Sequence, residues 1–275
     1  MNINVAFGQY CEGNSFLHRL DPRAKIIMSV LFIADVFIAK NAAAFALLAV
    51  FALFLTVWSR IGIGTVLHGL KPVVIIMIIT AVLNVFWYNG DTVLWSLGPV
   101  SISLEGIVNA VFIVLRVVIL LVGTGVILTY TTTPLALTDG LELLLAPLAK
   151  IKVPVHEFSL MMTIALRFIP TLAEETGKIM NAQKARGADF SEGSILKRAK
   201  ALIPILVPLF ASAFRRADEL AVAMECRCYR GGEGRTRMNV FRVSFKDVAA
   251  VTALVLLGAA LVILNVTVPG FSVGA

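Results

Sequence analysis

Long apolar runs separated by short polar segments dominate the pattern of hydrophobic and polar positions along the chain. A helix needs ~20 mostly apolar residues to cross a hydrocarbon core of ~30 Å. Five runs approach or exceed that length: Ile26–Ala39, Ala42–Trp58, Val73–Tyr88, Ile107–Tyr130 and Val248–Val268. We interpret Lys40-Asn41, after the short first run, as a tight turn between two crossings. The pattern therefore predicts an all-α integral membrane protein with about five transmembrane helices.

A different pattern fills the region between the fourth and fifth runs, where amphipathic stretches alternate with apolar stretches that contain proline. Three segments are distinguished by proline and glycine positions: a short helix in 137–154 that stops near Pro147, two stretches in 156–187 joined near Pro170, and a stretch in 195–232 broken by Pro204 and Pro208 that ends at Gly231-Gly232. The apolar parts are too short and interrupted to span comfortably, so they predict a platform of helices at the membrane surface. We thus expect three parts: a four-helix membrane bundle (1–130), the platform (131–247) and a final transmembrane helix with the C-terminus (248–275).

Composition and charge agree with a membrane protein and orient it. Hydrophobic residues make up 59% of the chain and charged residues 15%, whereas about a quarter of a soluble domain is charged. The platform holds 17 of the 24 Lys and Arg residues. By the positive-inside rule the N-terminus and the platform are expected in the cytoplasm, and the C-terminus outside. Topology and anionic lipid headgroups account for the basic excess, so no nucleic-acid partner is expected.

No set of residues typical of catalysis, a metal site or a cofactor site emerges. The three histidines are scattered and no nucleophile motif accompanies them. The segment from Thr176 to Ile179 lacks the upstream glycine and the terminal hydroxyl of a phosphate-binding loop. Cys226 and Cys228 are too few to form a zinc site, and we interpret them as small residues packed near a helix end. We expect a non-enzymatic subunit, in which any ATP hydrolysis belongs to a partner.

Two predicted helices end in an arginine between two small residues. The triplets are Ala185-Arg186-Gly187 and Cys226-Arg227-Cys228, 41 positions apart (227 − 186). Gly187 and the pair Gly231-Gly232 are suited to the left-handed residue that caps a helix. Arginine in a last helical turn is favoured by the helix dipole and needs no partner. Alternatively, small neighbours leave the guanidinium free to enter a groove on another protein.

Several stretches resemble one family over nearly the whole chain. They are GQYCEGNSFLHRLDPRAKI (8–26), TTTPLALTDGLELLLAPL (131–148), VPVHEFSLMMTIALRFIPTLAEE (153–175), AQKARGADF (182–190) and RRADELAVAMECRCYRGGEGRTRM (215–238). They are similar to the transmembrane T component of energy-coupling factor transporters, the bacterial importers of vitamins and metal ions. The resemblance implies a cell-membrane subunit that links two ATP-binding cassette ATPases to a small substrate-binding membrane subunit, with the selective pocket on another chain.

The same resemblance assigns roles to the two triplets. In the family they end a pair of coupling helices, and each arginine docks in a groove of one ATPase. Carried over, it implies Ala185, Arg186 and Gly187 for one ATPase, and Cys226, Arg227 and Cys228 for the other. Cys226 departs from the more common alanine, and because cysteine is nearly as small we expect docking to survive. The platform would then be a coupling domain.

Two charges within the apolar runs leave open both their own arrangement and the function of the chain. Asp35 and Arg116 lie inside predicted crossings, where charges are costly and usually functional. They either pair within the bundle or reach separately toward the headgroups. A self-contained proton-coupled secondary carrier would use Asp35 as its titrating group, and a membrane-anchored scaffold without transport would use neither. In the platform, we expect Arg167 to pair with Glu174, Glu175 or headgroup phosphates.

Overall fold

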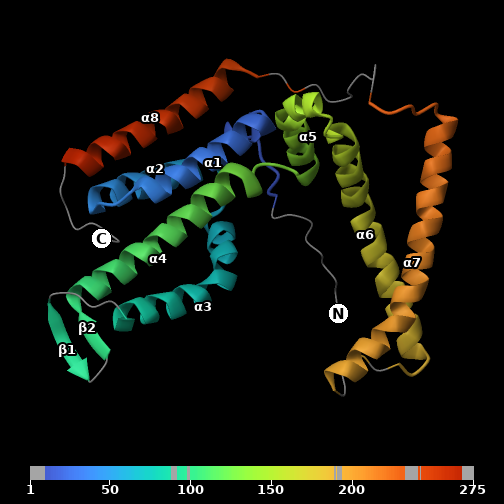
Figure 1. Ribbon diagram of the computed structural model, residues 1–275, viewed down its shortest axis with the longest axis horizontal. Helices are drawn as coiled ribbons and strands as arrows, with labels where there is room; N and C mark the ends of the chain where they lie inside the picture. The colour runs from blue at the N-terminus through green and yellow to red at the C-terminus, as the bar shows by residue number, and fades with distance from the viewer. Residues whose placement is uncertain are drawn as a thin grey trace. The chain divides into compact units, whose positions relative to one another are not determined.

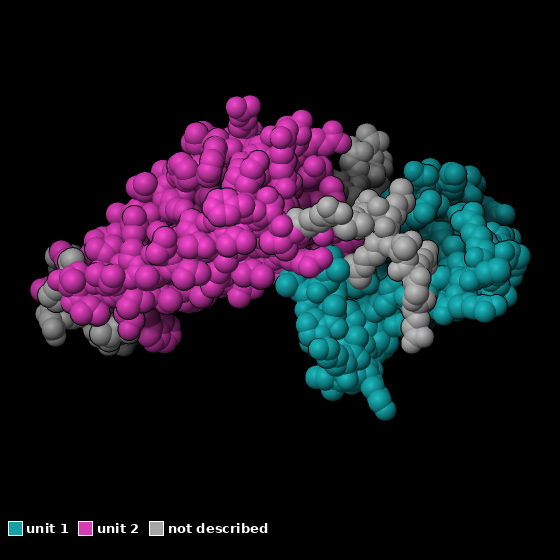
Figure 2. All heavy atoms as spheres, turned by 90° about the horizontal axis from the view of Figure 1, so that it is seen from above, with its two compact units in different colours: residues 1–7, 141–240 teal, residues 8–140, 241–275 magenta. Residues whose placement is uncertain are grey.

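The computed structural model describes residues 10–87, 92–97, 100–188, 190, 194–232, 241 and 243–267, and most of these are helical (Figure 1). The elements in chain order are η1 (Leu17–Arg19), α1 (Pro22–Ile38), α2 (Ala42–Ser59), α3 (Ile63–Trp87), β1 (Val93–Leu97), β2 (Val100–Ser103), α4 (Leu104–Thr124), η2 (Gly125–Thr129), α5 (Pro134–Leu145), η3 (Ala146–Ile151), α6 (Val155–Ala185), α7 (Ile195–Cys226) and α8 (Phe245–Thr267). They form two compact units, residues 1–7 with 141–240 (unit 1) and residues 8–140 with 241–275 (unit 2), coloured separately in Figure 2.

The predicted membrane helices are present in unit 2. Among the described residues four helices are long and apolar enough to cross a membrane: α2, α3, α4 continued by η2, and α8. The first predicted crossing is α1, whose 17 residues span about 26 Å. The turn at Lys40-Asn41 is confirmed, because α1 ends at Ile38 and α2 begins at Ala42. Asn265 of α8 holds this turn by donating from Nδ2 to the Ile38 carbonyl at 2.7 Å.

Proline positions account for most of the differences from the predicted boundaries. Helix α3 begins at Ile63, ten residues before the expected start (73 − 63), and contains Pro72. Helices α6 and α7 are each continuous, with Pro170 in α6 and two prolines in α7, so the predicted division into separate stretches is wrong. An interior proline removes one helical hydrogen bond and bends a helix without necessarily ending it. Figure 1 shows such bends in α3 and α7.

A short helix and a β-hairpin also belong to the fold. The predicted short helix near Pro147 is confirmed as α5, which ends at Leu145 and continues as η3. Between α3 and α4 the chain forms an antiparallel hairpin of β1 and β2, with Leu97 opposite Val100. The apolar pattern did not predict this hairpin, and it is a small addition to a helical fold.

The core of unit 2 is built around α1. This helix packs against α4 and α8, and α2 and α3 both pack against α4. The largest fully buried side chains include Phe32 of α1, Phe45 and Leu48 of α2, and Leu254 and Leu261 of α8. Because these residues lie on helices from both ends of the chain, the last helix is part of the same bundle as the first four.

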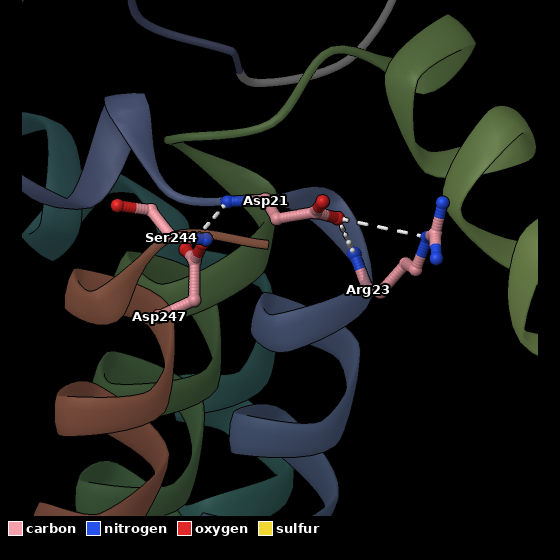
Figure 3. A network of polar contacts seen from close by, with 4 residues as sticks. All are labelled: Asp21, Arg23, Ser244 and Asp247. Atoms are coloured by element: carbon pink, nitrogen blue, oxygen red, sulfur yellow. Dashed lines mark hydrogen bonds and ion pairs between the residues drawn. The ribbon is translucent and has the colours of Figure 1, made fainter. Parts of the chain in front are cut away.

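Polar contacts fix the return of α8 to α1 (Figure 3). Asp21 caps α1 by accepting from the Arg23 N–H at 2.9 Å. Asp247 accepts from the Asp21 N–H at 2.8 Å through Oδ1 and from the Ser244 N–H at 2.6 Å through Oδ2. Reaching back to the residue before a helix is a typical capping contact. Asp247 therefore caps the first turn of α8 and joins it to the beginning of α1.

The two interior charges have separate surroundings. Asp35 is 5% exposed. Its carboxylate lies against Gly258 of α8, so closely that a Cβ on this glycine would be 2.5 Å from Oδ1. Arg116 donates from Nη2 to the Ala39 carbonyl at 3.1 Å, and its guanidinium lies 5.3 Å from the centre of the Phe45 ring, a typical cation–π distance. Although both are described, Asp35 and Arg116 form no ion pair with each other. Pairing within the bundle, the first alternative, is therefore not what the structure shows.

Candidate functional site

The two arginine-ended helices form one antiparallel pair within unit 1. Helices α6 and α7 contact each other, and Figure 1 shows them running in opposite directions. Their 31 and 32 residues correspond to about 45–50 Å each. Arg186 follows the last residue of α6 and Arg227 follows the last residue of α7. The structure therefore does not bring the two triplets together, but presents them at opposite ends of the pair.

The end of α6 is a Schellman motif. Arg186 is the C-cap residue, with φ −89° and ψ 8°, and Gly187 follows with φ 84°. The Gly187 N–H donates to the Lys184 carbonyl at 3.0 Å and the Ala188 N–H to the Gln183 carbonyl at 3.0 Å. These are the two hydrogen bonds that define the motif. The prediction that Gly187 is the left-handed cap is confirmed.

The end of α7 has the same backbone, but a cysteine takes the place of glycine. Arg227 has φ −89° and ψ 13°, and the left-handed residue is Cys228, with φ 56°. The Cys228 N–H donates to Glu225 at 2.8 Å and the Tyr229 N–H to Met224 at 3.0 Å. The prediction that Gly231-Gly232 caps this helix is wrong: Gly231 has φ 90° but lies beyond the cap. A left-handed non-glycine residue costs about 1–2 kcal/mol, which the hydrogen bonds of the last turn offset.

All six residues of the two triplets are exposed. They are Ala185, Arg186, Gly187, Cys226, Arg227 and Cys228. Cys226 and Cys228 are therefore not packed against other residues near the helix end, as was predicted. Both are free thiols. Within the part of the chain that the structure describes, no hydrogen bond or ion pair engages either guanidinium. A Cβ added to Gly187 would meet nothing within 4 Å. Each arginine is accessible to a partner.

The unusual backbone at Cys228 gives a testable expectation for the end of α7. Cys228→Gly should preserve this turn, whereas Cys228→Val places a β-branched residue where it fits poorly. The added strain of a left-handed residue is about 1–2 kcal/mol. If it destabilises the turn by that amount, amide exchange in the turn becomes roughly five- to thirtyfold faster. Hydrogen–deuterium exchange of the peptide covering 224–230 measures this, with Cys226→Val, inside the helix, as the matched control. Equal exchange in both valine variants would contradict the assignment of the cap to Cys228.

A polar contact joins α6 and α7 between their ends. Glu175 accepts from Ser212 Oγ at 2.5 Å through Oε1, and from Arg216 Nη2 at 3.0 Å through Oε2. The hydrogen bond from Ser212, with the positive charges of Arg216 and Arg215, lowers the pKa of Glu175 below its usual value. We call Glu175, Ser212 and Arg216 the clasp. Of the three alternatives expected for Arg167, pairing with Glu175 is wrong, because the partners of Glu175 lie on the next helix.

An apolar cavity of about 330 Å³ lies between the two helices beside the clasp. Helix α6 lines it with large side chains, and half of the lining residues of α7 are alanines, spaced four positions apart. The residues are Ile164, Phe168 and Leu172 of α6 and Ala213, Arg216, Ala217, Leu220, Ala221 and Met224 of α7. Small residues on one helix leave space that larger side chains would fill. The helices are therefore in close polar contact at the clasp and loosely packed beyond it.

A second polar contact fixes the beginning of α6. His156 Nδ1 lies 3.1 Å from Glu142 Oε1 of α5. A Cβ on Gly232 would lie 2.5 Å from His156 Cδ2, so the segment after α7 passes close to the same ring. In the described ranges, no group of three or more His, Cys, Asp or Glu residues is arranged to hold a metal ion. The contacts around His156 therefore connect helices, and they do not form a metal centre.

Comparisons with known proteins cover most of the chain. A family model described as a cobalt transport protein, CbiQ, matches residues 13–238. The energy-coupling factor transporter transmembrane protein EcfT of Thermosediminibacter oceani is 52% identical over 92% of this chain and 95% of its own length. The protein of that name from Ruminiclostridium cellulolyticum is 53% identical over 89% and 91%, respectively. That from Bacillus subtilis is 46% identical over 96% of this chain and all of its own length.

These similarities agree with the apolar helices of the structure. The matched family region includes α6, α7 and the bundle helices α1 to α4. The resemblance inferred from the sequence motifs is confirmed. The chain is a multi-pass membrane protein and a transporter subunit, and it belongs to the family of energy-coupling factor transporter transmembrane proteins.

Proposed function

We propose that the chain is the energy-coupling subunit of an ATP-driven vitamin or micronutrient importer. It holds two ATP-binding cassette ATPases through Arg186 and Arg227, and it carries a small substrate-binding membrane subunit. It has no catalytic activity of its own, and ATP hydrolysis belongs to the two partners. One observation carries this proposal. An exposed arginine follows each helix of the pair, both arginines stand in the same type of backbone turn, and the two turns lie at opposite ends of the pair.

The geometry favours one docking point for each ATPase. A guanidinium presents five donors in a planar fork, which suits carboxylates and carbonyls in a groove. The cap residues beside Arg186 and Arg227 are small, so a groove can enclose the guanidinium without meeting a large neighbour. Because the helices are antiparallel, the two arginines serve two separate proteins, and one subunit does not have to bind both.

The helix pair is also suited to transmit movement. Closure of the ATPases on ATP would draw the two docked ends together or change the crossing angle of α6 and α7. This change would repack the helices against the substrate-binding subunit and reorient it in the membrane. The physical requirement is a different free energy of contact with the open and the closed ATPases, because equal contact in both states transmits nothing.

The charge distribution supports an orientation for the chain in a bacterial cell membrane. Lys and Arg are concentrated in residues 131–247, which include α6 and α7, so these helices lie on the cytoplasmic side with the N-terminus. The C-terminus lies outside after α8 crosses. This arrangement places both arginines where ATP is present. The substrate is selected by the partner subunit in the membrane.

Affinity purification in mild detergent tests the composition of the complex. A tag on this protein in its native host should recover two different ATPases and a small hydrophobic membrane protein, identified by mass spectrometry. Two copies of one ATPase would modify the proposal, because both arginines would then bind identical grooves. Recovery of this chain alone would overturn it, provided that a known membrane complex from the same extract remains intact.

A further inference from the structure

The clasp has the same register as the two docking arginines. Glu175 precedes Arg186 by 11 residues (186 − 175), and Arg216 precedes Arg227 by 11 residues (227 − 216). Glu175 and Arg216 are therefore 41 positions apart, as the two docking arginines are. In an antiparallel pair, two residues that are equally far from the C-terminal ends of their helices face each other only near the point where the helices cross. From this crossing, both C-terminal arms extend by about 16 Å.

The clasp is suited to hold a crossing point while the helices rotate about it. Both carboxylate oxygens of Glu175 have partners on α7, and Ser212 is 5% exposed, whereas the flanking Glu174 and Arg215 are exposed. Because an acceptor oxygen tolerates a broad range of donor directions, these hydrogen bonds can persist through a small change in crossing angle. Interdigitated apolar side chains would resist the same rotation.

The space required for such a rotation is present on one side of the clasp. The cavity begins at Leu172 and Ala213, next to the clasp, and extends to Ile164 and Met224. This is the side on which α7 continues toward Arg227. The Arg227 arm can therefore approach α6 by closing the cavity, without displacing a large side chain from the contact at the clasp.

We propose that Glu175, Ser212 and Arg216 form the fixed pivot of α6 and α7, about which the two arginine-ended arms change their crossing angle during transport. This proposal rests on the coupling function proposed above. In this role Glu175 and Arg216 are positioning residues that touch neither ATP nor substrate. They keep the crossing point constant, so that movement of one arm is converted into rotation and not into sliding of the helices past each other.

Cross-linking at two distances from the clasp tests the pivot directly. The pair Leu172→Cys and Ala213→Cys lies at the clasp, and the chain without added cysteines, treated with the same reagent, is the control for the native thiols of Cys11, Cys226 and Cys228. The pair Ile164→Cys and Met224→Cys lies at the far end of the same cavity. Each pair is joined in the assembled complex by the same reducible bifunctional thiol reagent. We expect the link at the clasp to leave transport close to that of the reduced protein, and the distant link to stop transport until it is reduced.

Charge variants provide a second test with a readout that simple misfolding would not produce. Glu175→Gln should lower transport about tenfold, within the usual range of coupling free energies, while ATP hydrolysis and both ATPases are retained. The double variant Glu175→Arg with Arg216→Glu restores an ion pair between α6 and α7, and it should therefore transport better than Glu175→Gln. Glu174→Gln, an exposed carboxylate on the same helix, is the matched control and should transport as the wild type does.

The outcomes separate this proposal from the one on which it rests. If the ATPases are retained and depend on Arg186 and Arg227, the coupling function stands. The pivot is then overturned if the link at the clasp blocks transport as fully as the distant link, if the distant link leaves transport intact, or if Glu175→Gln transports like Glu174→Gln. A Glu175→Gln protein that loses its ATPases would also overturn it, because the clasp would then only maintain the fold.

Discussion

Replacing both Arg186 and Arg227 with alanine is expected to abolish retention of the ATPases and, with it, transport. Removing one partner of a buried, hydrogen-bonded charge contact usually costs about 2–5 kcal/mol, and every 1.4 kcal/mol is about tenfold in affinity. Two such losses at separate sites should release both ATPases at the concentrations of a purification. The measurement is the amount of each ATPase retained per membrane subunit, together with substrate uptake in reconstituted vesicles.

Single variants add selectivity to this expectation, because the arginines lie at opposite ends of the helix pair. Arg186→Ala should weaken retention of one ATPase and Arg227→Ala that of the other. Exposed Lys184, in the last turn of α6, provides the control, and Lys184→Ala should retain both. If each arginine variant released both ATPases equally, the assignment of one arginine to each partner would be wrong.

Lysine substitutions distinguish docking from simple helix capping. Arg186→Lys and Arg227→Lys keep the positive charge that favours the end of a helix dipole, but they lose the planar fork of donors. A capping role predicts full retention of the ATPases in the lysine variants. A docking role predicts losses approaching those of the alanine variants. Retention and transport at wild-type levels in both the lysine and the alanine variants would contradict docking.

The sequence was sufficient to predict the class of fold and the end of α6. Lengths of apolar runs predict membrane helices because the bilayer sets a fixed span, and the turn at Lys40-Asn41 follows from the polar break between two runs. Gly187 could be assigned as a cap because glycine adopts the left-handed conformation without strain. These are local properties, and neighbouring residues suffice to predict them.

The features that the sequence did not reveal depend on contacts between helices. The third apolar run was expected to begin at Val73 and Pro170 was expected to divide a helix, but α3 continues through Pro72 and α6 continues through Pro170. Cys228 is left-handed because the turn after Arg227 requires it, although its residue type does not suggest this. The clasp pairs Glu175 with residues 37 and 41 positions away. Opposite charges at the same 41-residue separation as the arginines were the one sequence signal for that contact.

Substituting alanine for Gly123 is expected to destabilise the bundle more than a one-carbon change suggests. Gly123 of α4 lies against the Phe32 ring of α1, and a Cβ there would overlap the ring atoms Cε1 and Cζ. Phe32 is fully buried, at 0% exposure, so its ring has little room to move. Overpacking of this kind costs about 1–3 kcal/mol, which should lower the melting temperature in detergent by several degrees.

A matched glycine separates this steric effect from the helix propensity of alanine. In α3, a Cβ on Gly64 would meet nothing within 4 Å, so Gly64→Ala should leave the melting temperature unchanged or raise it, since alanine favours a helix by about 0.5–1 kcal/mol over glycine. Combining Gly123→Ala with Phe32→Leu should be less damaging than the sum of the two, because neighbouring changes that share a cavity are not additive. Equal melting temperatures for Gly123→Ala and Gly64→Ala would contradict the close approach of α1 and α4.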